Sequence, residues 1–286
     1  MSAPLSISTS EMLDSLKRSG YLIESEIAKE LTNLCFFVEA NQVIQDPFTG
    51  KSREIDLLAE YNKYDPERAE NRVAAKIKFV FEIKNNIYPI VLLTELPHSP
   101  NIDLTLSLKI GQTGQYAVSG IEPTEYFSYL FLGNEPDEIK TFTQYCSFQP
   151  KKNNAELMAF HPEEIHTGLN KITQYSEECA EFWEDYDPEK PWNVDYNRNF
   201  LFLPAFILNN ALFQLTISDE GNPLLEEVDY SRILFNYHYK DSLKQALVYF
   251  VTRKGLEAFL DKMLEIEEKV EANMLTAKKE QEKGDN

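Results

Sequence analysis

The sequence predicts a mixed α/β fold in which a central mixed sheet is flanked by helices. An amphipathic, helix-like pattern in residues 10–33 is followed by three strand-like runs, in residues 35–46, 53–61 and 76–84. A second helical pattern, in residues 161–186, is followed by more strand-like segments. Helices and strands that alternate in this order are typical of a sheet with helical layers on its faces.

The first helical pattern carries apolar residues at helical spacing, among them Leu13, Leu16, Ile27 and Leu31. Gly20 interrupts it. Because glycine in a helix interior is unfavourable, this residue predicts two consecutive helices rather than one.

The three strands are predicted to be neighbours. Residues 46–52, DPFTGKS, contain Asp-Pro and Thr-Gly, which favour turns, so the first two strands should form a hairpin. In the third strand Ile77, Phe79 and Phe81 alternate, as expected for a buried sheet face. Val80 between them indicates that the other face is covered as well.

The rest of the chain is predicted in less detail. We expect a single domain over residues 1–286, with residues 85–160 as a large insertion or subdomain after the third strand. Short strand-like runs in that insertion leave its topology open; they are residues 88–96, 126–132 and 142–148. In the C-terminal part, residues 200–217 should form a hairpin that turns at Asn209 and Asn210, and residues 245–252 should form a last strand. An amphipathic helix is expected in residues 253–274 and a disordered tail in residues 275–286.

Composition limits the classes of function. The net charge of −19 is unusual for a protein that binds nucleic acid. More than half of the acidic excess lies in residues 176–286, however, whereas residues 71–175 are nearly neutral. No window approaches the roughly 18 apolar residues of a membrane span. The N-terminal residues lack the basic start and apolar stretch of a signal peptide, so we expect a cytoplasmic protein.

Metal sites built from cysteine or histidine are not indicated. The three cysteines, Cys35, Cys146 and Cys179, are far apart and are expected to be reduced. The four histidines show no ligand spacing closer than five residues, and we interpret His161 and His166 as capping or surface groups.

Three charged residues in the strands form the candidate site. Asp56 lies in REIDLLAE, and Glu82 and Lys84 lie in FVFEIKN. Residues i and i+2 of a strand share a face, so Glu82 and Lys84 should project together. A divalent cation held by two carboxylates can neutralise phosphoryl oxygens and activate water, and Mg²⁺ needs only one or two carboxylates. The alternative is a solvated face of ordinary charges, although acids among apolar strand residues are costly unless paired or metal-bound.

The segments GKSREIDLLAE and KFVFEIKNN resemble the PD-(D/E)XK nuclease superfamily, whose restriction-endonuclease-like fold has an α-β-β-β-α-β core. Asp56, Glu82 and Lys84 match its motif, and Ile55 stands in place of the proline. The resemblance covers residues 10–84 and 161–217, and it implies that residues 85–160 are an insertion that governs substrate choice.

The resemblance also implies a metal site for Mg²⁺ or Mn²⁺. Its ligands would be Asp56, Glu82, the backbone carbonyl of Ile83 and a glutamate of the first helix. Glu24 is the first choice for that glutamate, and Glu26 is the second.

Some relatives carry a Gln-h-x-x-Tyr pattern on the helix after Glu-x-Lys. Lys171 and Tyr175 match this spacing in the second predicted helix, with lysine in place of glutamine. The segment of residues 112–116 fits the pattern too, but its glycine disfavours a helix. Lys171 is therefore the candidate for the fifth catalytic residue.

As a whole, the resemblance implies a Mg²⁺-dependent endonuclease of bacterial restriction or phage-defence type, with DNA favoured over RNA. The sequence does not decide whether the chain also binds a protein partner or forms a homodimer. The alternative is a catalytically silent nuclease-like module that binds a protein or nucleic acid. Three acids in one pocket also predict that at least one has a raised pKa without metal, and that Asp56→Asn is at least as stable as the wild type.

Overall fold

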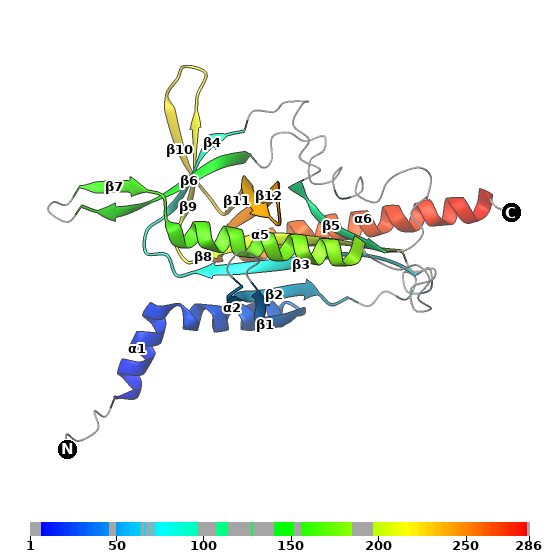
Figure 1. Ribbon diagram of the computed structural model, residues 1–286, viewed down its shortest axis with the longest axis horizontal. Helices are drawn as coiled ribbons and strands as arrows, with labels where there is room; N and C mark the ends of the chain where they lie inside the picture. Colours follow the sequence, from blue (N-terminus) through cyan, green and yellow to red (C-terminus); the bar gives the residue numbers. More distant parts are fainter. Residues whose placement is uncertain are drawn as a thin grey trace.

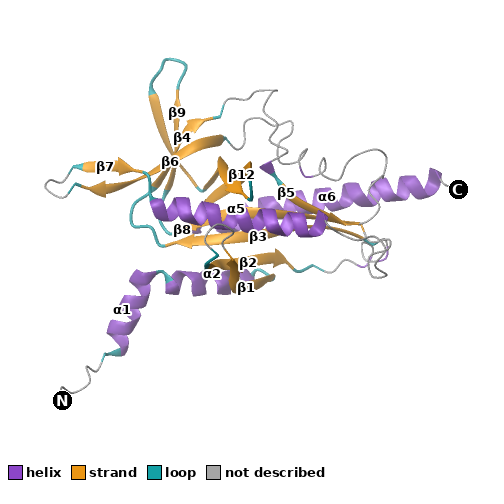
Figure 2. Ribbon diagram, viewed as in Figure 1, coloured by secondary structure: helices purple, strands orange, loops and turns teal. Residues whose placement is uncertain are grey.

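The computed structural model describes residues 7–45, 50–63, 66, 70, 72–96, 107–113, 127, 140–151, 156–184 and 197–284. Its described strands form one large, open, mixed sheet that carries helices on both faces (Figures 1 and 2). The expectation of a mixed α/β fold is confirmed. The expected turn at residues 46–49 and most of the run at 126–132 lie outside the described residues.

Two helices open the described chain, α1 (Thr9–Ser19) and α2 (Tyr21–Asn33). Gly20 separates them with a left-handed φ of 92°, which confirms the break expected at this glycine. A reciprocal capping box starts α1: the Ser8 side chain accepts a hydrogen bond from the Glu11 N–H, and the Glu11 carboxylate accepts one from the Ser8 N–H.

Three antiparallel neighbours follow, namely β1 (Phe36–Gln45), β2 (Ser52–Tyr61) and β3 (Val73–Lys84). The crossover helix α5 (Glu163–Glu184) then leads to β8 (Asn197–Leu208), which pairs parallel with β3 along its whole length. The chain therefore runs α2-β1-β2-β3, then α5-β8, with β4 to β7 between the two parts.

Residues 85–160 contribute four described strands, β4 (Ile90–Glu95), β5 (Lys109–Thr113), β6 (Thr141–Pro150) and β7 (Leu157–Phe160). The sheet continues through β9 (Leu212–Ile217), β10 (Pro223–Val228), β11 (Tyr230–Tyr239) and β12 (Ser242–Thr252). Because β5 pairs with β8 and β6 pairs with β11, the described strands of the insertion belong to the central sheet.

The prediction of a hairpin in residues 200–217 is wrong. β8 and β9 do not pair with each other; β9 pairs with β4 and β10 instead. The edges of β8 are occupied by β3 on one side and by β5 and β12 on the other. At the turn, Asn210 donates to the carbonyl of Ile87 at 2.5 Å, so the chain is directed towards β4 rather than back along β8.

Different helices cover the two faces of the sheet. α2 and α6 (Leu256–Gly284), which follows the 3-10 turn η2 (Arg253–Gly255), pack on the face that buries Phe79 and Phe81. α5 packs on the opposite face, together with Val80. These three residues have no exposed surface, which confirms that both sides of this strand are covered.

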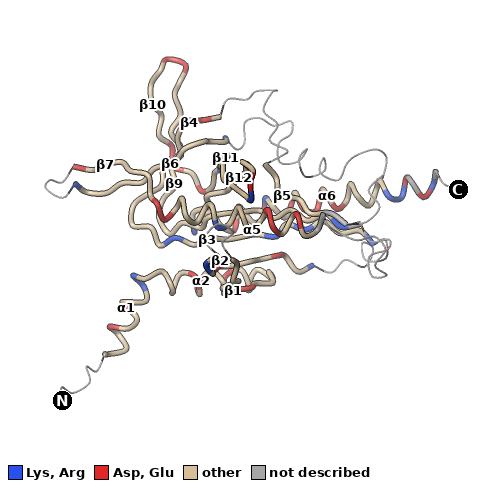
Figure 3. The backbone as a smooth tube through the Cα atoms, viewed as in Figure 1, with Lys and Arg blue, Asp and Glu red and all other residues tan. Residues whose placement is uncertain are grey.

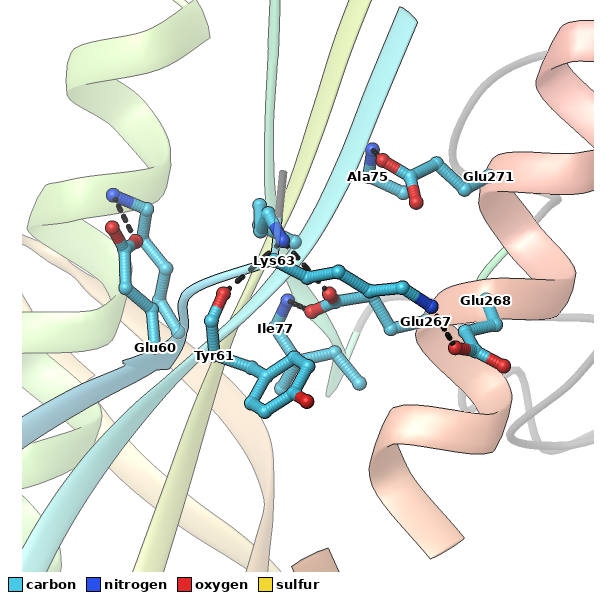
Figure 4. Close-up of polar contacts among 10 residues, drawn as sticks. Glu60, Tyr61, Lys63, Ala75, Ile77, Glu267, Glu268 and Glu271 are labelled. Carbon is cyan, nitrogen blue, oxygen red and sulfur yellow. Dashed lines mark hydrogen bonds and ion pairs between the residues drawn. The ribbon is translucent and has the colours of Figure 1, made fainter. Parts of the chain in front are cut away.

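Carboxylates of α6 bind the part of the β3 edge that lies beyond the ladder with β2 (Figure 4). The β2 ladder ends at the pair Glu60–Lys78. Beyond it, the N–H of Ile77 donates to Glu267 at 2.7 Å, and the N–H of Ala75 donates to Glu271 at 3.4 Å. Side chains therefore satisfy backbone donors that no strand reaches.

The prediction of a disordered tail in residues 275–286 is wrong for the described residues, because α6 continues to Gly284. Met274 and Ala277 are buried on the inner face of this helix. Charged composition predicted disorder here, but an apolar residue once per turn is enough to keep the helix packed.

Candidate active site

The candidate site lies where β2 and β3 separate. Their ladder ends at the pair Leu57–Phe81, so Asp56 and Glu82 are the next residues on each strand. On its other side, the ladder between β1 and β2 skips the pair of Asn41 and Asp56, and Asn41 has a left-handed φ of 55°. Asp56 therefore stands at a gap in both ladders.

The Asp56 carboxylate replaces a strand partner for β3. Its Oδ2 atom accepts a hydrogen bond from the backbone N–H of Ile83 at 2.8 Å. In a strand, the N–H and C=O of one residue point to the same edge. The Ile83 carbonyl, expected as a metal ligand, therefore faces the edge on which the Asp56 carboxylate lies.

Glu82 is the buried acid of the site. It is 3% exposed, and its Oε1 atom accepts a hydrogen bond from Lys84 Nζ at 2.7 Å. Both side chains lie on the α5 side of β3, as their i, i+2 relation predicts. Gly168 of α5 lies over Glu82 so closely that a Cβ there would be 3.1 Å from Glu82 Oε1.

One ammonium group joins the two acids. Lys171, on α5, forms ion pairs with Glu82 Oε2 and, at 3.2 Å, with Asp56 Oδ1. It also donates to the carbonyl of Glu54 at 2.6 Å. Glu82 Oε2 is buried and accepts no hydrogen bond from the described residues, so its contact with Lys171 is an ion pair without hydrogen-bond geometry.

Glu24, on α2, lies near enough to the site for the charges of Asp56 and Glu82 to act on it. Burial raises the pKa of Glu24, and the negative charges of Asp56 and Glu82 raise it further, against the opposing effect of Lys171 and Lys84. One acid of the group therefore has a raised pKa, mainly because it is partly buried and in smaller part because the other acids repel its charge.

Glu26, the second choice for the first-helix glutamate, is directed elsewhere. It forms an ion pair with Arg253 Nη1 at 2.5 Å, on the side of α2 that meets η2. The structure therefore separates two glutamates that the sequence left as alternatives.

Lys84 is held as a cation. Burial alone would lower the pKa of Lys84. The charge of Glu82, its hydrogen bond to Lys84 and the charges of Asp56 and Glu164 outweigh burial, so the pKa is raised. Lys84 thus carries a positive charge at neutral pH and is suited to stabilising negative charge rather than to accepting a proton.

These contacts revise the expected stability of Asp56→Asn. The expectation rested on repulsion among three acids. Lys171 and Lys84 offset much of that repulsion, and the variant would lose the ion pair with Lys171 while leaving the ammonium beside Glu82. We therefore expect Asp56→Asn to be slightly less stable than the wild type without metal.

The donor atoms fit a hard divalent cation. Among the described residues, no group of three or more His, Cys, Asp or Glu side chains is arranged as a metal site. Two carboxylates suffice for Mg²⁺, which keeps several waters, and oxygen ligands suit Mn²⁺ equally. Asp56 and Glu82 already lie against one shared cation, the Lys171 ammonium.

Other candidates from the sequence lie apart from this chemistry. Gln112, the start of the second Gln-h-x-x-Tyr segment, lies in strand β5, whereas that pattern requires a helix. Cys35, Cys146 and Cys179 are free, in line with the expectation of reduced thiols. His166, exposed near the start of α5, lies with its Nδ1 atom 3.4 Å from the Tyr145 hydroxyl.

Sequence reasoning missed Gly168, whose lack of a side chain lets α5 approach Glu82. The available signal was a glycine inside a strong helical pattern, three residues before Lys171; such a glycine often has a packing reason.

Comparison with known proteins adds no relative: no family model, curated protein or solved structure matches the chain. None of the helices that the structure describes is long and apolar enough to cross a membrane.

Proposed function

We propose that this chain is a divalent-cation-dependent nuclease that hydrolyses phosphodiester bonds, a DNA endonuclease of restriction or phage-defence type. The observation that carries the proposal is the shared ammonium. Asp56 and Glu82, from neighbouring strands, contact one cationic group, and Lys84 lies directly beside them. This arrangement supports a two-carboxylate metal site with an adjacent lysine.

The order of the elements supports the same proposal. With β4 to β7 set aside, the order α2-β1-β2-β3-α5-β8, with β8 parallel to β3, is the order expected of a restriction-endonuclease-like core. Asp56 lies on the second strand, Glu82 and Lys84 near the end of the third, and Lys171 on the following helix.

Each side chain has a role in the proposed reaction. Asp56 and Glu82 would hold the divalent cation, which would neutralise phosphoryl oxygens and lower the pKa of a bound water. Lys84, charged at neutral pH, stabilises the negative charge that develops on the phosphoryl group. Lys171 balances the charge of the two acids, and a bound divalent cation would take over this balancing role from its ammonium group.

The direct test is cleavage of plasmid, linear and single-stranded DNA with Mg²⁺ or Mn²⁺, against an EDTA control. Asp56→Asn and Glu82→Gln should lose cleavage and also the rise in melting temperature that the cation gives the wild type. RNA in a parallel reaction separates DNA from RNA specificity. A wild type that neither cleaves nor is stabilised by the cation contradicts the proposal.

A second candidate has one observation in its favour. Because Lys171 already pairs with both acids, the cluster is electrically compensated without a metal. A catalytically silent nuclease-like module would use these residues as a structural ion-pair network. In that case the cation would not affect the melting temperature of the wild type, and Asp56→Asn would only destabilise the fold.

A further inference from the structure

The last turn of α1 is tied to the residue that follows Lys84. Asn85 Nδ2 donates to the backbone carbonyl of Lys17 at 3.0 Å and to that of Arg18 at 3.4 Å. Asn85 Oδ1 accepts from Asn209 Nδ2, just after β8, at 2.9 Å. One side chain therefore connects the end of α1 to the ends of β3 and β8, beside the candidate site.

α1 is positioned in this way although it contributes nothing to the core. None of its residues is buried, and the helix projects from the body at its junction with α2 (Figure 1). An isolated helix of 11 residues is marginal in water. Its contacts with α2 and Asn85 therefore fix its place, and that place is next to the C-terminal end of β3.

Charge is unevenly distributed along α1 (Figure 3). Lys17 and Arg18 occupy its last turn, next to Asn85, whereas Glu11 lies in its first turn. Both basic side chains are exposed, and neither forms an ion pair within the part of the chain that the structure describes. Asp14 lies one turn earlier on α1, but among the described residues it forms no ion pair with either of them. Two exposed positive charges thus lie at the edge of a site whose acids Asp56 and Glu82 are already paired with Lys171.

We propose that the last turn of α1 binds the phosphodiester backbone of a nucleic acid beside the candidate active site. Lys17 and Arg18 make the phosphate contacts, and Asn85 is a positioning residue. The inference rests on the proposed function and gives it a place for the substrate. A chain with a net charge of −19 needs local cations to hold a polyanion. Arginine and lysine supply such cations: arginine binds phosphate through its planar guanidinium group, and lysine binds it as a point charge.

Holding a phosphate next to Lys84 would also fix the neighbouring bond in the site. A contact of this kind, made equally with the bound substrate and with the transition state, strengthens binding without changing the rate of the chemical step. Because Lys17 and Arg18 do not touch the reacting atoms in this proposal, their loss should raise KM and leave kcat unchanged.

The test is binding of a fluorescently labelled DNA duplex in EDTA over a series of NaCl concentrations, so that binding is measured without cleavage. Lys17→Ala/Arg18→Ala should bind more weakly than the wild type. The slope of log affinity against log salt should fall by about 1.8, because each phosphate contact contributes about 0.9.

Lys278→Ala/Lys279→Ala is the matched control. It removes the same two charges from the last turns of α6, at the opposite end of the molecule (Figure 1), and should keep the wild-type slope. Asn85→Ala keeps both charges of α1 and should still weaken binding, since it releases the carbonyls of the last turn. In the presence of Mg²⁺, the double variant of α1 should raise KM alone and keep the cation-induced rise in melting temperature.

The outcomes separate this inference from the proposed function. A slope for the α1 variant equal to that of the wild type or of the control overturns the inference, whatever the cleavage activity. Salt-dependent binding that is lost with Lys17 and Arg18, in a protein that never cleaves, supports the inference and ends the nuclease proposal. A wild type that does not bind the duplex even at low salt overturns the inference as well.

Discussion

Gly168 of α5 lies directly over the Glu82 side chain: a Cβ at position 168 would come within 3.1 Å of both Glu82 Cγ and Glu82 Oε1. The same Cβ would lie 2.8 Å from Phe206 Cζ. This close approach places Lys171, three residues further along α5, within reach of Glu82 and Asp56. The missing side chain at one position thus sets the distance between helix and sheet on which the whole cluster depends.

Gly168→Ala should therefore destabilise the protein. In an ordinary helix interior this change would add about 1 kcal/mol of stability. Here overpacking against Phe206 and Glu82 should lower the free energy of unfolding by about 1–3 kcal/mol. Urea denaturation measures the difference, and Thr167→Ala, at the exposed neighbouring position, is the control. A stabilised Gly168→Ala protein would show that α5 does not rest on Glu82.

Lys171→Met should leave Asp56 and Glu82 facing each other without their shared cation. Removing one partner of a buried ion pair costs about 3–5 kcal/mol, an upper value here because Lys84 still contacts Glu82. Mg²⁺ should restore much of this loss, so the cation should raise the melting temperature more in this variant than in the wild type.

The control for Lys171→Met is Lys240→Met, which breaks an exposed ion pair with Glu181 and should change stability little. Equal destabilisation of Lys171→Met with and without Mg²⁺ would favour the structural ion-pair network over a metal site.

Glu24→Gln should not unfold the protein at neutral pH. Because the pKa of Glu24 is raised in the fold above its ordinary value of 4.5, its negative charge opposes folding. The favourable contribution of the protonated acid is present below pH 4.5 and disappears as the pH rises through the raised pKa. As the pH rises towards neutral, the free energy of unfolding of Glu24→Gln should therefore increase relative to that of the wild type.

The same substitution should weaken metal binding and cleavage. Glu26→Gln, two residues further along α2 but paired with Arg253, is the matched control and should cleave normally. If both variants retain full activity, Glu24 is an ordinary acid beside the site.

Lys84→Ala should lose cleavage while the cation still raises its melting temperature, because the assigned role of Lys84 is to stabilise developing charge rather than to hold the ion. Lys78→Ala removes a lysine from the same strand that pairs with Glu60 instead, and it should cleave like the wild type. Since the pKa of Lys84 is raised, the wild-type rate should not fall between neutral and moderately alkaline pH through loss of this proton. If the rate of the wild type falls over this pH range while the rate of Lys84→Arg does not, Lys84 loses its proton there and is not charged as proposed.

Local sequence patterns determined the strands and the face on which the charged residues lie. Alternation of Ile77, Phe79 and Phe81 predicts β3 and its buried face, because successive side chains of a strand point to opposite sides. The same period places Glu82 and Lys84 together. Gly20 predicts the break between α1 and α2 for an equally local reason, its tolerance of a positive φ.

The tertiary structure alone decided how these parts meet. Asn209 and Asn210 predict a turn, but which strands pair beyond that turn depends on which edges are already occupied, and β8 has none to offer β9. The pairing of Lys171 with Asp56 and Glu82 likewise requires a helix and two strands far apart in the chain to approach closely. Spacing along the chain fixes which residues share a face; only packing fixes which faces come within the few ångströms over which buried charges act strongly on each other.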